Sequence, residues 1–174
     1  TSIRRRKDGV IFEFLAVPDT NARALRLIAG EIDILQGDIS PDIYDYLLKQ
    51  RNLRGMRARG TTFSYLGFNL SEGVSAEIKL RRAVALAVNR EEILKFLFHG
   101  TARLASAIFP PEHWAGSNSL PKTKFDPQSA RILVSQLEEK YGSISLSYKT
   151  STNKFRQRIA AVIQSQLADV GIDL

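Results

Sequence analysis

Blocks of apolar residues alternate with polar breaks along the first part of the chain. Residues 10–17 are β-branched, aromatic and almost continuously apolar, which predicts a buried strand. A helix is expected next, with Asp19 or Thr20 as its cap and Gly30 as its left-handed stop. Isoleucines then alternate with an acid over residues 31–35, which predicts a short strand. The chain therefore begins as an alternating β and α pattern.

The middle of the chain continues with helices and extended segments. Ser40 is expected to cap a second helix, because a proline and an acid follow it directly. Residues 53–58 and 61–70 are predicted to be extended, and the second segment is rich in aromatic residues. Helical spacing of apolar residues predicts a helix over 75–88, and Asn89 with a glutamate three residues later predicts the start of another.

A long irregular stretch separates these helices from the last elements. Residues 101–125 contain several prolines, and loops of this length in compact domains are usually functional or disordered. Asp126 is expected to cap a helix, residues 144–148 alternate as a strand, and residues 155–170 have a helical apolar face. Residues 172–174 look like the start of another strand. Because so short a strand gains little alone, we expect the chain to be truncated on this side.

Composition narrows the class of protein. The 174 residues are 44% hydrophobic and 25% charged, which is typical of a globular domain. The absence of cysteine excludes disulfides, thiolate metal sites and cysteine nucleophiles. No apolar run approaches the roughly 20 residues that span a bilayer. The chain starts at Thr1 rather than methionine, so we expect a processed or excised piece.

The net charge of +7 raises the question of a nucleic-acid partner. The basic residues are scattered over several short groups, including residues 4–7 and 51–59, instead of forming one stripe. Scattered charge of this kind is typical of a solvated face. We therefore expect no nucleic-acid binding.

Catalytic and metal-binding signals are weak. His99 and His113 do not have the spacing of paired metal ligands, and no phosphate-binding loop or serine nucleophile motif occurs. Three pairs of carboxylates are present, and solvent exposure or helix capping explains them: Asp33 with Asp38, Asp42 with Asp45, and Glu138 with Glu139. The sequence therefore predicts no catalytic residue, no metal site and no cofactor.

Aromatic and hydrogen-bonding residues gather at predicted strand ends and in the long stretch. They are Tyr65, Asn69, Phe109, His113, Trp114, Tyr148, Thr150, Ser151 and Asn153. Ligand pockets in α/β proteins commonly lie at the carboxyl ends of strands and are walled by such residues. For Tyr65 and Tyr148 a place in the core or at a sheet edge is the alternative, and for Asn153 a helix cap is. Phe109 and Trp114 are favoured, since large rings are costly to expose without a partner.

Several short motifs follow one another in a recognisable order. They are Ala-Gly-Glu-Ile-Asp-Ile at 29–34, Tyr-Leu-Gly-Phe-Asn at 65–69, the run from Leu80 to Ile93, Gly-Thr-Ala at 100–102 leading to Pro110 and Pro111, Phe-Asp-Pro at 125–127, and residues 159–172. This order resembles that of the extracellular solute-binding proteins of family 5, whose members bind peptides or nickel for ABC importers. At residue 125 phenylalanine replaces the usual tyrosine. The resemblance extends from about residue 10 to residue 174.

The resemblance implies an α/β fold with periplasmic-binding-protein-like lobes of type II, in which helices flank mixed sheets. The family proteins are much longer, so the chain is expected to hold only part of the two lobes. Residues 1–72 would end the first lobe, and residues 73–174 would form the first half of the second, with the loop 101–125. The acidic residue that holds a peptide's amino group in such proteins maps to later sequence.

Ligand-binding residues are also implied by the resemblance. Residues 102–111 look like the family's loop that approaches the cleft, which nominates Ile108 and Phe109. Leu104, Ala105 and Ile108 depart from the tyrosines of peptide binders. Tyr65 and Asn69 match the strand that leads to the crossover between lobes. The full set of ligand-binding candidates is Tyr65, Asn69, Ile108, Phe109, Trp114, Thr150 and Asn153.

The expected function is that of the substrate-binding component of an ABC importer. It would capture a small ligand such as an oligopeptide by hinge closure and deliver it to the transmembrane subunits of a permease. The expected location is periplasmic or extracellular, with membrane association through the permease or through a lipid anchor outside this chain. The alternative is a ligand-sensing domain of the same fold in a transcriptional regulator, and a hydrolase ranks third. Peptides, nickel chelates and sugars all remain open as substrates.

Overall fold

The computed structural model describes every residue of the chain except Asp38 and Glu72. Asp38, one of the carboxylates paired by the sequence with Asp33, therefore lies outside the described residues. Internal contacts divide the chain into two units, residues 1–57 and 58–174. The predicted boundary after residue 72 concerns the lobes of a complete two-lobed protein and stays a prediction.

The first unit starts with a two-stranded hairpin. Strand β1 (Ser2–Arg4) pairs antiparallel with β2 (Ile11–Glu13), and all six positions are exposed. The prediction of a buried strand over 10–17 is therefore wrong in length and in burial. The apolar run has only one short partner strand, and a ribbon of two strands cannot cover its own faces.

Two helices complete the first unit. In α1 (Thr20–Ala29) the carboxylate of Asp19 accepts a hydrogen bond from a backbone amide at 2.7 Å, and Gly30 ends the helix with φ of 74°. In α2 (Pro41–Leu48) the hydroxyl of Ser40 caps the first turn. Both helices begin at the predicted capping residues, and α1 also ends at the predicted glycine, because side-chain oxygens and a glycine satisfy the free backbone groups.

Three predicted extended segments form no strand in the part of the chain that the structure describes. They are residues 31–35, 53–58 and 61–70. Their sequences have the alternation of strands, but a strand also requires a neighbouring backbone to complete its hydrogen bonds. Half-buried Leu66 and Phe68 still pack against the core of the second unit, so 61–70 is an extended segment held by its side chains.

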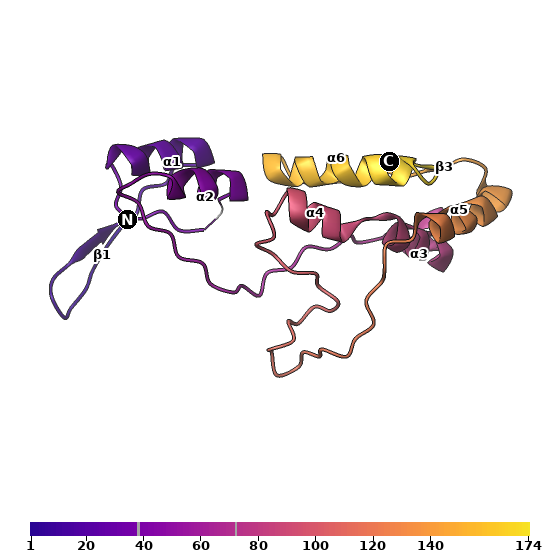
Figure 1. Cartoon of the computed structure of the whole chain (residues 1–174), viewed down its shortest axis with the longest axis horizontal. Coiled ribbons are helices and arrows are strands. Elements are labelled where there is room, and N and C mark those ends of the chain that lie inside the picture. The colour runs from indigo at the N-terminus through magenta and orange to yellow at the C-terminus, as the bar shows by residue number, and fades with distance from the viewer. Residues whose placement is uncertain (38, 72) are drawn as a thin grey trace. The chain divides into compact units, whose positions relative to one another are not determined.

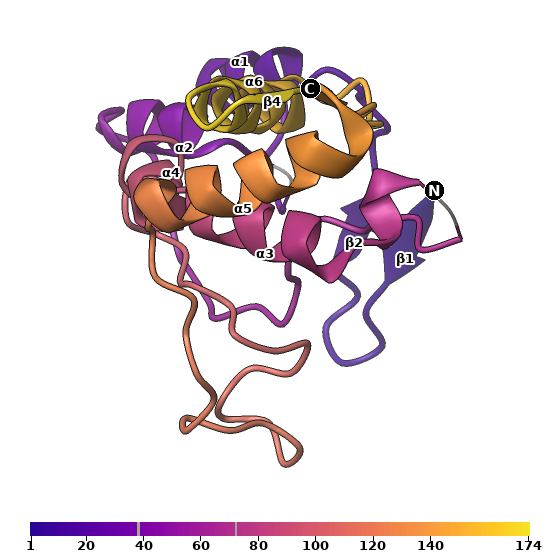
Figure 2. The ribbon, with the colours of Figure 1, turned by 90° about the vertical axis from the view of Figure 1, so that its right-hand side faces the viewer.

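Helices build the second unit around one apolar core. Their bounds are Val74–Ala76 for the 3-10 turn η1, Ile78–Ala87 for α3, Arg90–Phe96 for α4, Pro127–Tyr141 for α5 and Lys154–Ala168 for α6. In Figures 1 and 2, α3 runs beside α5, and Gln166 of α6 is hydrogen-bonded to Asn89 and Glu92 at the start of α4. Leu80, Val134 and Leu167 are among the fully buried side chains that bring α3, α5 and α6 together.

A small parallel sheet joins the ends of α5 and α6. Strand β3 (Ile144–Ser145) pairs with β4 (Ile172–Asp173), and α6 forms the crossover between them, as parallel strands require. The strand predicted over 144–148 is shorter than expected, although the amide of Leu146 still donates to the carbonyl of Asp173 at 2.8 Å. The predicted strand start at 172–174 is confirmed.

The segment between α4 and α5 is irregular, as the sequence predicts for residues 101–125. Figures 1 and 2 show it running away from the helices of the second unit and returning to the start of α5. Asp126 then caps α5 through the amide of Ser129 at 3.0 Å. Within the described residues, no helix is long and apolar enough to cross a bilayer.

Candidate functional site

A pocket of about 650 Å³ lies within the second unit. One part of its wall is the extended segment 60–68, and another is the first half of the long loop, residues 102–111. Helices α3, α4 and α6 contribute core-facing side chains, among them Val84, Ile93 and Ile163. The loop and the extended segment thus meet over the apolar core.

Aromatic side chains form a large part of the pocket wall. The rings that line it are Phe63, Tyr65, Phe68, Phe98, Phe109 and Tyr148. Phe63 and Tyr65 lie with ring centroids 5.7 Å apart, and Phe98 packs edge-on against Phe155 at 5.0 Å. A cavity with aromatic walls and a few polar groups is the usual form of a small-molecule site.

The charge of the pocket is one-sided. Three arginines line it, Arg81, Arg90 and Arg103, and its described lining contains no aspartate or glutamate. Arg103 forms a twofold ion pair with Glu112, whereas the hydrogen bonds of Arg81 and Arg90 go to backbone carbonyls, which carry no net charge. A ligand in this pocket therefore meets net positive charge.

Stacked rings organise the loop next to the pocket. The ring of Phe109 lies nearly parallel to that of His113 at 4.5 Å, and His113 contacts Trp114 at 5.5 Å. The Nδ1 atom of His113 accepts a hydrogen bond from the amide of Ala115 at 3.1 Å. His113 therefore supports the ring of Phe109 and has a local structural role.

The structure brings three of the predicted residues together. Tyr65, Ile108 and Phe109 all line the pocket, with 76%, 64% and 46% of their surfaces exposed. Tyr148, for which a core or edge position was the alternative, lines the pocket as well. Aromatic content selected Tyr65 and Phe109, and the resemblance nominated Ile108; that they bind a ligand stays a prediction.

The other four candidates do not line the pocket. The side chain of Asn69 accepts a hydrogen bond from the amide of Ser71, and that of Asn153 caps α6 through the amide of Arg156. Trp114 is 92% exposed, and Thr150 is exposed in the segment before α6. Their roles in ligand binding stay predictions.

Several pocket residues were not candidates from the sequence. Phe63 and Phe68 belong to the predicted extended segment, and their aromatic character was a signal that could have selected them. Arg81 and Arg90 lie in a helical pattern that gave no reason to expect them at a pocket. Only the packing of the loop onto these helices reveals their position.

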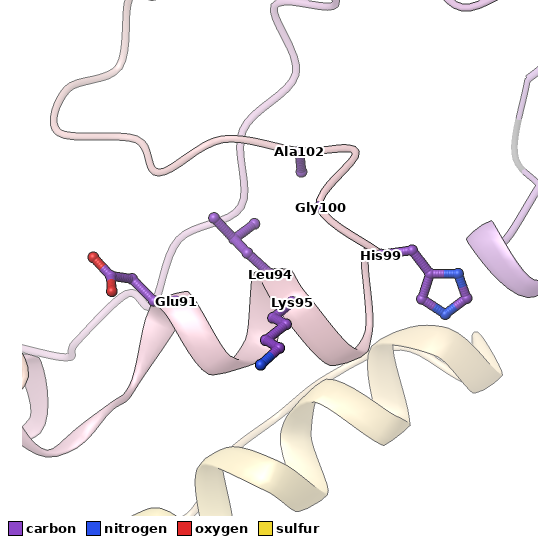
Figure 3. A pocket seen from close by; sticks show the side chains of 6 residues that line it. All are labelled: Glu91, Leu94, Lys95, His99, Gly100 and Ala102. Atoms are coloured by element: carbon purple, nitrogen blue, oxygen red, sulfur yellow. The ribbon is translucent and has the colours of Figure 1, made fainter.

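A second hollow of about 510 Å³ borders α4. Its lining residues are Glu91, Leu94, Lys95, His99, Gly100 and Ala102. Figure 3 shows Glu91 and His99 at opposite ends of this group, so their side chains do not converge. Among the residues that the structure describes, no group of three or more potential ligands is placed to hold a metal ion.

Comparison with known proteins identifies the family. The model for bacterial extracellular solute-binding proteins, family 5 middle, matches residues 6–174. The chain belongs to this family. The resemblance inferred from the motifs is thereby confirmed, and these solute-binding proteins give no support to the alternative of a transcriptional regulator.

Relatives of this family-5 chain include transport proteins of enteric bacteria. The peptide transport periplasmic protein SapA of Salmonella typhimurium is 28% identical over 153 residues, which are 86% of this chain and 28% of SapA. The dipeptide-binding protein of Escherichia coli is 26% identical over 163 residues, 91% of this chain and 30% of that protein. The chain thus spans less than a third of the length of these relatives.

Solved structures confirm the expected fold for this family-5 chain. The oligopeptide-binding protein AppA of Bacillus subtilis, in complex with a nonapeptide, matches with a TM-score of 0.75 and 26% identity over 90% of this chain and 34% of AppA. The periplasmic binding protein DppA of Helicobacter pylori, in complex with the peptide STSA, matches with a TM-score of 0.77 and 25% identity, covering 90% of this chain and 30% of DppA. The prediction of type II periplasmic-binding-protein architecture, present here in part, is correct.

Proposed function

We propose that the chain is part of the substrate-binding protein of an ABC importer. The complete protein captures a small ligand such as an oligopeptide between two lobes and delivers it to a membrane permease. The observation that carries this proposal is the aromatic pocket of the second unit, in a chain that matches the family over residues 6–174. Residues 1–72 would end the first lobe and residues 73–174 would begin the second.

The proposed ligand site includes Tyr65, Ile108 and Phe109 on the wall of the pocket. Asn69, Trp114, Thr150 and Asn153 would complete it only when lobe closure brings further surfaces to them. Burial of apolar ligand surface against the rings would supply affinity, and the positive lining favours a ligand that offers a carboxylate or another anionic group. A peptide meets both conditions, because it has apolar side chains and a terminal carboxylate.

No catalytic role is part of this proposal. The pocket lining offers hydroxyls and arginines, and among its described residues none is a general base placed next to a nucleophile. The proposed location is periplasmic or extracellular, in line with the periplasmic names of the relatives. Contact with the membrane would come through the permease or through a lipid anchor.

Native mass spectrometry of the full natural protein, purified from its own host, tests the proposal. A retained small molecule with the mass of a peptide supports peptide import, and an adduct with the mass of a nickel chelate changes the substrate class. A full-length protein that carries a DNA-binding segment and no adduct would contradict the import function.

A further inference from the structure

One arginine holds both ends of the pocket-forming loop. Arg90 is the first residue of α4, and its guanidinium donates to the carbonyl of Ala105 at 3.2 Å through Nη1 and to the carbonyl of Thr123 at 2.8 Å through Nη2. Ala105 lies near the start of the irregular stretch and Thr123 near its end. A single side chain therefore joins the two ends of almost the whole irregular segment between α4 and α5.

The position of this guanidinium is set by the core of the second unit. Asn89 caps α4 directly before Arg90, and the buried Ile93, one turn later, belongs to the core cluster. Gln166 of α6 accepts from the amide of Asn89 at 3.0 Å, which fixes the start of α4 against the neighbouring helix. Arg90 itself is half-buried. Through Arg90, the two ends of the loop are therefore attached to a helix that packs on the core of the second unit.

The chemistry of the side chain suits this task. A guanidinium is a planar fork whose two outer nitrogens reach two acceptors at once, whereas a lysine ammonium is a point charge on a flexible stem. An irregular segment of this length has many open conformations, and closing its ends removes a large share of them. The consequence is greatest for residues 105–111, because these residues wall the pocket.

We propose that Arg90 is a positioning residue of the ligand site, which holds Ile108 and Phe109 against the pocket by fastening Ala105 and Thr123 to the start of α4. This inference rests on the proposed function, because it treats the pocket as a place for a ligand. Arg90 also lines the pocket and contributes to its positive charge, so Arg90→Lys, which keeps the charge, separates the positioning role from the effect of charge.

The test compares Arg90→Lys and Arg90→Ala with a matched control, Arg82→Lys, in the full natural protein. Arg82 is exposed on α3, and its replacement by lysine keeps the positive charge, as Arg90→Lys does. Hydrogen exchange read by mass spectrometry follows the loop, far-UV circular dichroism follows folding, and an equimolar tripeptide mixture serves as the binding probe.

For Arg90→Lys we expect faster exchange in residues 105–123, with unchanged exchange in α3, α5 and α6 and an unchanged spectrum. Tripeptide affinity should fall about tenfold, the loss expected for hydrogen bonds from a charged donor. Arg82→Lys should change neither readout. Arg90→Ala should increase both effects, because it removes the remaining donor.

Two results would overturn the inference. One is exchange in residues 105–123 that stays at the wild-type rate in both Arg90 variants, or that rises equally throughout the core. The other is a faster loop with unchanged tripeptide affinity. The wild-type protein could also bind no tripeptide while the loop still exchanges faster in the Arg90 variants. That result would support the role of Arg90 in holding the loop and would contradict peptides as the ligand, so the failure of one proposal is distinguishable from the failure of the other.

Discussion

Arg103 donates two parallel hydrogen bonds of 2.8 Å to Glu112, one to each carboxylate oxygen. This pair joins two points of the irregular loop on either side of Ile108 and Phe109. Both side chains are about half exposed, so the pair stabilises the loop more through its fork geometry than through burial. It forms a second fastening of the pocket wall, beside that of Arg90.

Acid should therefore loosen this part of the loop. Hydrogen bonding to Arg103 lowers the pKa of Glu112 from its ordinary 4.5 to about 2. Because the pKa is lowered in the folded state, the pair contributes fully above about pH 4.5 and its contribution is lost as the pH falls toward 2. The measurement is a carbon-13 NMR titration of the Glu112 carboxyl.

The matched variant is Arg103→Gln, which keeps a hydrogen-bonding side chain and removes the charge. It should raise the midpoint of the Glu112 titration toward the ordinary range of glutamate, because the hydrogen bond to Arg103 is the largest cause of the lowered pKa. A midpoint that stays unchanged in this variant would mean that another group holds the carboxylate.

A second prediction concerns the polar bridge between α4 and α6. The side-chain oxygen of Gln166 accepts from the amide of Asn89 at 3.0 Å, and its nitrogen donates to the carboxylate of Glu92 at 3.1 Å. Gln166→Leu leaves this half-buried amide unpaired and should lower the free energy of unfolding by about 1 kcal/mol. Chemical denaturation measures it. Gln157→Leu, an exposed change on the same helix, should leave stability within about 0.5 kcal/mol.

A third prediction tests the core of the second unit. Leu80 is completely buried where α3 packs on α5. Leu80→Ala removes a buried side chain and leaves a cavity, so the free energy of unfolding should fall by about 2–5 kcal/mol. Ile78→Ala on the same helix removes a side chain that is more than half exposed and should cost clearly less. Equal losses in the two variants would argue against this packing of α3.

Helices were predictable from the sequence because their signals are local. Asp19, Ser40, Asn89, Asp126 and Asn153 each cap the helix that follows them, and each acts within three residues of its own position. Their starts could therefore be located without knowledge of the fold.

Strands were much less predictable, because each requires a partner that the local pattern does not name. The apolar run at 10–17 and the aromatic segment at 61–70 have strand-like sequences, yet only Ile11–Glu13 pairs. The strand at Ile172 was found because the glycine before it ends a clear helix. Its partner at Ile144 follows from the crossover by α6.

Only part of the pocket lining was among the residues selected from the sequence. Phe109 was selected because large exposed rings need a partner, and Tyr65 because of its place at a predicted strand end and in a family motif; both line the pocket, whereas Trp114, selected by the same argument as Phe109, does not. Arg90 could not be selected, since its two acceptors are backbone carbonyls of residues far along the chain. Every residue has a backbone carbonyl, so the sequence does not show which carbonyls accept a hydrogen bond from an arginine.

The last prediction compares a ring that lines the pocket with an exposed ring outside it. Phe109 lines the pocket, whereas Phe96 lies on α4 away from it and is 60% exposed. If the pocket binds the ligand, Phe109→Ala removes apolar and stacking contact and should weaken tripeptide binding by the full natural protein about tenfold. Phe96→Ala removes the same ring from a surface without a ligand and should leave affinity unchanged. Titration calorimetry with the tightest tripeptide of the mixture measures both, and equal affinities for the two variants would remove Phe109 from the site.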